Sequence, residues 1–194
     1  MYVHFFKRII DILIGLLALP FVLFSTIVIG PLIYFEDKGP IFYKAKRIGK
    51  RGNMFSMYKF RSMKVNAPDI RLLSGDTFNG DNDPRVTKIG RFLRKNSIDE
   101  LPQFLNVLNG TMSFIGPRPD TFDFLHIYED KYPDVLTIRP GLTGYNQAYF
   151  RNSIEGEEKM KNDNYYVEHL SLWMDTKIVF KTIKTVLFRE NINH

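Results

Sequence analysis

Residues 12–35 read ILIGLLALPFVLFSTIVIGPLIYF, a run of 24 residues without a charged side chain. A helix of about 20 apolar residues crosses the hydrocarbon core of a bilayer, so this run predicts a membrane-inserted helix. A cleaved signal peptide fits less well, because its apolar core is about 7–15 residues long and ends at a small-residue cleavage site. The position of this helix constrains how the rest of the chain lies relative to a membrane.

Basic residues flank the apolar run on both sides. Lys7 and Arg8 precede it, and residues 36–51 contain six Lys and Arg residues against two acidic ones. Because basic flanks favour the cytoplasmic side, one straight crossing cannot satisfy both ends. Pro20 lacks an amide hydrogen and clashes with the preceding turn, so we expect a kink there. We therefore predict a re-entrant membrane helix over residues 1–36; a straight anchor with a mild kink is the alternative.

The composition of the whole chain predicts one globular unit beside this helix. The chain has 194 residues, of which 44% are hydrophobic and 25% are charged, and its net charge is +6. This length suits a single compact domain after the helix, covering residues 37–194. The chain has no Cys, which excludes disulfides and thiolate chemistry. The positive charge favours anionic partners such as phosphate, nucleotide, nucleic acid or a membrane surface.

Local patterns predict a small mixed domain. Residues 40–64 resemble a β-hairpin with a Gly-rich turn, and residues 101–108 show apolar side chains at helical spacing before Gly110. Short helices are expected near residues 89–94 and 121–132. The C-terminal helix from Trp173 is amphipathic and basic, and either lies on an acidic membrane or packs in the core. The predicted fold class is α+β: the re-entrant helix, a β-hairpin and several amphipathic interfacial helices.

The residues that could carry chemistry are carboxylates and arginines. The histidines show no metal-ligand spacing, and no nucleotide-binding or nucleophile-elbow motif occurs. Asp99 and Glu100 are adjacent, and Mg²⁺ together with substrate phosphate oxygens would relieve their repulsion. Arg94 and Arg118 could bind phosphate. The alternative is structural, because the SxxE pattern of residues 97–100 is also a helix capping box.

Several motifs follow one another in a fixed order. They are DPR at 83–85, GRFLR at 90–94, SIDELP at 97–102, MSFIGPRP at 112–119 and RPGLTG at 139–144. This series resembles the bacterial sugar transferase family, the monotopic phosphoglycosyl transferases that start glycan assembly on a polyprenyl phosphate. The resemblance covers essentially the whole chain and corresponds to the minimal catalytic form, without an added N-terminal domain.

The resemblance implies a reaction and a role for individual residues. A nucleotide-diphospho-sugar, usually a UDP-sugar, gives its sugar phosphate to Asp99 and releases UMP. Polyprenyl (undecaprenyl) phosphate then takes the group, in the first membrane step of O-antigen, capsule, exopolysaccharide or glycoprotein glycan synthesis. Glu100 would bind Mg²⁺ with Asp99. Arg118 would bind phosphate, and Arg94 and Arg151 would bind the nucleotide-sugar.

The resemblance also implies a location and partners. It places the chain on the bacterial inner membrane, with the active site on the cytoplasmic face and Lys7, Arg8 and Pro20 at the membrane. No nucleic acid is expected, and further glycosyltransferases could act on the product. The chain departs from the family pattern at Leu19, at Thr111 and over residues 145–150, near where donor recognition could occur. The alternative function is a membrane-anchored, non-catalytic binder of anionic lipid or nucleic acid, in which Asp99 has no role.

Overall fold

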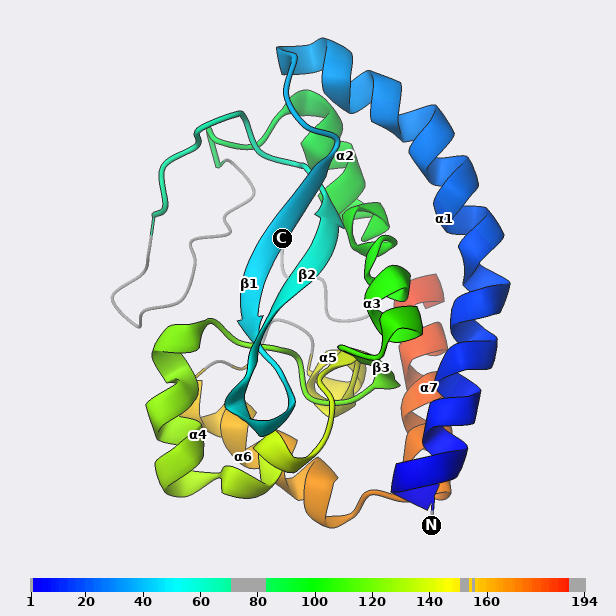
Figure 1. The fold of residues 1–194 in the computed structure, drawn as a ribbon, viewed down its shortest axis with the longest axis vertical. Coiled ribbons are helices and arrows are strands. Elements are labelled where there is room, and N and C mark those ends of the chain that lie inside the picture. The colour runs from blue at the N-terminus through cyan, green and yellow to red at the C-terminus, as the bar shows by residue number, and fades with distance from the viewer. Residues whose placement is uncertain (1, 71–82, 151–153, 155, 189–194) are drawn as a thin grey trace.

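The computed structural model describes residues 2–70, 83–150, 154 and 156–188 (Figure 1). The α-helices are α1 (Lys7–Asp37), α2 (Lys88–Lys95), α3 (Gln103–Asn109), α4 (Leu125–Lys131), α5 (Tyr145–Tyr149), α6 (Gly156–Glu168) and α7 (Leu172–Phe188). The strands are β1 (Phe42–Ile48), β2 (Met54–Phe60), β3 (Ser113–Ile115) and β4 (Gly141–Thr143). A short π-helix covers Tyr2–Phe6. Short 3-10 helices cover Lys50–Gly52, Ile98–Glu100 (η3), Phe122–Phe124 and Pro133–Thr137 (η5).

Helix α1 runs along one whole side of the molecule and bows around it (Figure 1). Pro20 and Pro31 both lie inside this helix, so the helical backbone continues past them. Among the described residues, α1 is the one helix that is long and apolar enough to cross a bilayer. One side of α1 packs on the domain, whereas large apolar residues, including Leu17, Phe21 and Ile27, are exposed. The predicted N-terminal apolar helix is confirmed.

The N-terminal end of α1 is bound to the domain. Lys7 Nζ lies 2.5 Å from the carboxylate of Asp175 in α7. Arg8 donates hydrogen bonds of 2.6 and 2.8 Å to the carbonyls of Val107 and Leu108, the last carbonyls of α3. Carbonyls in the last turn of a helix lack the usual partner four residues on, so the guanidinium of Arg8 acts as a C-terminal cap, alongside the amide of Gly110, which donates to the carbonyl of Val107. The two basic residues predicted to lie at the membrane therefore also tie α1 to the protein.

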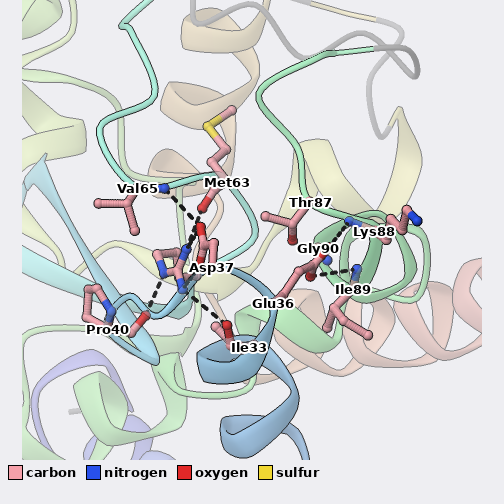
Figure 2. Close-up of polar contacts among 11 residues, drawn as sticks. Ile33, Glu36, Asp37, Pro40, Met63, Val65, Thr87, Lys88, Ile89 and Gly90 are labelled. Carbon is pink, nitrogen blue, oxygen red and sulfur yellow. Dashed lines mark hydrogen bonds and ion pairs between the residues drawn. The ribbon is translucent and has the colours of Figure 1, made fainter.

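The other end of α1 returns to the same domain. Asp37 forms an ion pair with Arg61, just after β2, and Glu36 accepts hydrogen bonds from the start of α2 (Figure 2). Between the two ends, Gly15 lies against Leu108 of α3, where a Cβ would come within 2.7 Å of Leu108 Cδ2. The domain thus holds α1 at both ends and at its middle.

The predicted β-hairpin is confirmed, and it forms the centre of the domain (Figure 1). Strands β1 and β2 are antiparallel, with Ala45 paired to Met57. These two residues are buried together with Val107 of α3 and with Met112. Residues two apart in a strand share a face, so Lys59 lies on the same side of β2 as Met57, and it is only partly buried.

A second, parallel strand pair was not predicted from the sequence. Ser113 in β3 pairs with Gly141 in β4, and the amide of Gly116 donates a 2.9 Å hydrogen bond to the carbonyl of Thr143. Both strands are only three residues long, which is too short for an alternating pattern to stand out. The pairing brings the two Gly/Pro-rich turns side by side, and Gly144 packs so closely on Gly116 that a side chain would not fit.

Helix α7 is amphipathic as predicted, and its apolar side chains are divided between the core and the surface. Ile178 and Thr185 are buried, and Val179 packs against the same cluster as Ile178. Ile183 is 49% exposed and Phe180 is 69% exposed. An exposed apolar surface beside basic residues is typical of a helix that lies on a membrane.

Candidate active site

The adjacent carboxylates lie in η3, the short turn between α2 and α3. Ser97 precedes this turn with a left-handed backbone (φ 55°) and makes no side-chain capping hydrogen bond. Helix α3 starts later, after Pro102, without a side-chain cap. The capping-box interpretation is therefore wrong. The left-handed residue turns the chain so that Asp99 is buried, with 6% of its surface exposed.

Glu100 is the most heavily compensated carboxylate of the site. Its Oε1 atom accepts a 2.7 Å hydrogen bond from Lys59 Nζ and a 2.6 Å hydrogen bond from Arg118 Nη2. Burial alone would raise the pKa of Glu100, but the charges and hydrogen bonds of Arg118 and Lys59 outweigh it. The pKa of Glu100 is therefore held well below its ordinary value, and the pKa of Arg118 is raised in return.

Asp99 differs from its neighbour because no group among the described residues donates a hydrogen bond to its carboxylate. Burial raises the pKa of Asp99, and the negative charge of Glu100 adds to this effect. The charges of Lys59, Arg94 and Arg118 oppose it. Asp99 is thus an uncommitted, poorly solvated carboxylate surrounded by three cations, which suits a nucleophile that must meet a phosphate.

Arg94 lies in the last turn of α2, and its side chain is held by Ser62, two residues after the end of β2. Its Nε atom donates a 2.9 Å hydrogen bond to Ser62 Oγ. Burial lowers the pKa of Arg94, while the charge of Asp99 raises it. The structure therefore places Arg94 where it feels the charge of Asp99, and its role as a substrate ligand stays a prediction.

Arg118 lies in the turn between Pro117 and Pro119 and connects the dyad with a second polar cluster. Its side chain is 39% exposed, so a ligand can reach the guanidinium while Glu100 fixes its position. The backbone carbonyl of Arg118 accepts a hydrogen bond from Lys159 of α6. A shallow hollow beside this turn is lined by Arg118, Asp120 and Tyr128 together with apolar residues of η5.

The second cluster is an ion network behind the Pro-Arg-Pro turn. Lys159 Nζ lies 2.5 Å from Asp120 Oδ2 and 3.4 Å from Asp163 Oδ2, and Tyr128 donates a 2.6 Å hydrogen bond to Asp120. Asn146 donates to the other oxygen of Asp163. Burial raises the pKa of Asp163 to about 6, against the opposing charge of Lys159.

Sequence reasoning did not single out all of the residues in these two clusters. The sequence placed Lys59 only within the predicted β-hairpin. The available signal was a lysine between Tyr58 and Phe60 in a mostly apolar strand. Lys159 and Asp163 have the i, i+4 spacing of a helical ion pair, which is too common to mark a site. The predicted substrate ligand Arg151 lies outside the described residues.

The donor set at the dyad fits a magnesium ion only in part. Among the described residues, no group of three or more His, Asp or Glu side chains could enclose a metal ion. Mg²⁺ needs only one or two carboxylates, because it keeps water and phosphate ligands. Within the described ranges, the Asp99 carboxylate receives no hydrogen bond, and Glu100 Oε2 accepts one long hydrogen bond of 3.4 Å from Arg118. The Asp99 carboxylate and Glu100 Oε2 could bind the ion, whereas Glu100 Oε1 is already hydrogen-bonded to Lys59 and Arg118.

Comparison with known proteins assigns this chain to a family. The family model described as bacterial sugar transferase matches residues 2–189. The chain is 39% identical to the undecaprenyl-phosphate galactose phosphotransferase of Salmonella typhimurium over 204 residues, which cover 96% of this chain and 41% of the relative. It is 41% identical over 191 residues to the UDP-N-acetylgalactosamine-undecaprenyl-phosphate N-acetylgalactosaminephosphotransferase of Aeromonas hydrophila, covering 94% of this chain and 44% of the relative.

A third relative is closer in length. The exopolysaccharide production protein ExoY of Sinorhizobium fredii is 40% identical over 191 residues, which cover 93% of this chain and 84% of the relative. The chain spans about two fifths of the Salmonella and Aeromonas relatives. The chain belongs to the bacterial sugar transferase family.

The raised pKa of Asp163 predicts a specific dependence of stability on pH. The folded protein keeps this proton up to pH of about 6, whereas the unfolded chain loses it near pH 3.8. The free energy of unfolding of the native protein should therefore fall, relative to Asp163→Asn, as the pH rises through this window. Two pH units correspond to about 3 kcal/mol. Denaturant unfolding of both proteins in detergent at several pH values measures the difference, and parallel stability curves would contradict it.

Proposed function

We propose that this chain transfers a sugar phosphate from a nucleotide-diphospho-sugar, a UDP-sugar, to undecaprenyl phosphate and releases UMP. The observation that carries the proposal is the unequal pair of carboxylates. Glu100 is committed to Lys59 and Arg118, whereas no group in the described part of the chain donates to Asp99, which feels the charge of three cations. The relatives named as undecaprenyl-phosphate sugar phosphotransferases support the same reaction class.

In the first step, a carboxylate oxygen of Asp99 attacks the phosphorus that carries the sugar. The bond from this phosphorus to the bridging oxygen breaks, and UMP leaves with the bridging oxygen and its electron pair. The product is an acyl phosphate that links Asp99 to the sugar phosphate. Arg94 and Arg118 would hold the phosphate oxygens and compensate the charge that develops on them, which is the main source of catalysis in phosphoryl transfer.

In the second step, an oxygen of the undecaprenyl phosphate attacks the same phosphorus, and the Asp99 carboxylate is released. The lipid then carries a diphospho-sugar, so atoms and charges balance over the two steps. A carboxylate suits this role because an acyl phosphate stays reactive towards a second phosphate. The poor solvation of Asp99 favours attack, since little water must be removed from its charged form.

The proposal includes a magnesium ion held by Asp99 and Glu100 Oε2. When bound, the ion would neutralise negative charge on the diphosphate oxygens. The protein cations alone would compensate the diphosphate charge only in part, because Lys59 and most of the Arg118 guanidinium are already paired with Glu100.

We also propose that α1 enters and leaves the bilayer on the cytoplasmic side of the bacterial inner membrane. Contacts at both ends of the helix support this arrangement, since Lys7 binds Asp175 and Asp37 binds Arg61 of the same domain. A straight crossing would carry one of these ends to the opposite side of the bilayer and break its ion pair. The lipid acceptor and the soluble donor would then meet at one interface.

Replacing the nucleophile tests the reaction directly. Asp99→Asn keeps the shape of the side chain but removes the attacking charge, so we expect UMP release to fall by at least about 1,000-fold. Purified protein, Mg²⁺, undecaprenyl phosphate and a panel of UDP-sugars provide the assay. Asp130→Asn, an exposed carboxylate of α4, is the matched control. Turnover by Asp99→Asn close to the native rate would remove Asp99 from the mechanism, and an Asp99-independent binder of lipid or nucleic acid would become the better account.

Removal of divalent metal tests the ion. We expect an excess of chelator to stop UMP release and added Mg²⁺ to restore it, because the diphosphate charge is then uncompensated. The measurement is the initial rate across a Mg²⁺ titration. Full activity in chelator would show that the protein cations alone suffice.

The location of the N-terminus tests the path of α1. A cysteine placed in a short tag before Met1 should stay inaccessible to a membrane-impermeant thiol reagent applied from the periplasmic side. The chain has no Cys of its own, so the label reports on the tag alone. Efficient periplasmic labelling would instead establish a straight crossing.

A further inference from the structure

The last two residues of α1 make contacts that reach towards the active site. Glu36 and Asp37 lie at the point where the membrane helix ends, and Figure 2 shows their side chains turned in two different directions. Glu36 points to the start of α2, and Asp37 points to the chain that follows β2. Neither residue belongs to a motif on which the sequence analysis relied.

Glu36 caps α2 from a distant part of the chain. One of its carboxylate oxygens accepts a 2.6 Å hydrogen bond from the amide of Lys88, and the other accepts a 3.2 Å hydrogen bond from the amide of Ile89. The Thr87 side chain accepts from Gly90, so the first amides of α2 are satisfied jointly. A carboxylate at this end also interacts favourably with the helix dipole. The position of α2 is therefore tied to the end of α1.

Asp37 fixes the segment that follows β2. Its two carboxylate oxygens accept hydrogen bonds of 2.6 Å each from Arg61, in the bidentate arrangement that is strongest for this pair. Arg61 is 6% exposed and also donates to the carbonyls of Pro40 and Met63. A buried guanidinium with this many partners has one position available to it.

These two anchors meet at Arg94. Helix α2, which Glu36 caps, carries Arg94 in its last turn. The hydroxyl that accepts from Arg94 belongs to Ser62, the neighbour of Arg61. Gly90 packs directly on the backbone of Ser62, so no side chain could separate α2 from this segment. The end of α1 thus holds both the helix that carries Arg94 and the residue that orients its guanidinium.

We propose that Glu36 and Asp37 are positioning residues, through which the docked end of the membrane helix sets the place of Arg94 beside Asp99. This role rests on the proposed function, in which Arg94 binds the donor phosphates. Neither carboxylate touches the substrate. Their effect is to hold the Arg94 guanidinium in one location when the end of α1 is bound to the domain. A displacement of about 1 Å at such a site can reduce a rate on the order of 100-fold.

A double-mutant cycle tests the proposal. Glu36→Ala should reduce kcat/KM for UMP release at least about tenfold. Arg94→Ala should reduce it further, and the double variant should be no slower than Arg94→Ala alone, because Glu36 acts only through Arg94. Glu36→Gln, which keeps one oxygen acceptor for the amides of α2, should recover part of the activity. Asp130→Ala, an exposed acidic residue with no such contacts, should behave like the native protein.

The outcomes separate this proposal from the proposed function. Losses that multiply in the double variant, or native activity of Glu36→Ala, would overturn the positioning role while leaving the reaction intact. Absence of Asp99-dependent UMP release from the native protein would instead overturn the function. Should Glu36→Ala fail to fold, the same cycle with Glu36→Gln and with Asp37→Asn decides the question. Each of these retains an acceptor, and its loss must again vanish in the Arg94→Ala background.

Discussion

The candidate active site depends on one interaction, the binding of Glu100 by Lys59 and Arg118. Two cations from separate parts of the chain, β2 and the Pro-Arg-Pro turn, converge on a single carboxylate oxygen. A partly buried carboxylate with two such partners stays ionised, and its partners are in turn held in place. The neighbouring Asp99 thereby receives no hydrogen bond from the residues that the structure describes, in a positive environment. The chemical difference between two adjacent acids follows from which of them the cations contact.

The rest of the fold holds these cations at the required positions. The hairpin presents Lys59, and the parallel pair of β3 and β4 fixes the turn that carries Arg118. Lys159 supports this turn from α6 through the carbonyl of Arg118 and through Asp120. Helix α1 closes the frame, since it is anchored to α3, α7, α2 and the end of β2. An apolar helix attached at so many points belongs to the same folded unit as the rest of the described chain.

Several parts of the fold could be predicted from the sequence because their signals are local. The apolar run, the hairpin and helices α2 and α3 follow from composition, periodicity and turn residues. Arg94 and Arg118 could be selected as candidates from the sequence because they lie in a basic motif and in a rigid Pro-Arg-Pro turn, close in sequence to Asp99 and Glu100. The pair of β3 and β4 could not be found, since each strand has three residues and its partner lies far along the chain.

Other features needed the three-dimensional structure because the deciding partner is distant in sequence. The capping-box reading failed at Ser97, whose left-handed backbone turns the dyad inwards. The burial of Ile178 in place of Ile183 on α7 depends on packing against α5, and periodicity alone cannot choose between adjacent faces. The role of Lys59 depends on Glu100, which lies 41 residues away.

The most direct test of this account is mass analysis of the protein after brief exposure to its nucleotide-sugar donor with Mg²⁺ and without lipid acceptor. The account predicts a mass increase equal to one sugar phosphate, located by peptide fragmentation on Asp99 and lost when undecaprenyl phosphate is added. Asp99→Asn should show no increase. A native protein that turns over the same donor while no phosphosugar forms on Asp99 would contradict the central claim and would favour direct transfer from donor to lipid.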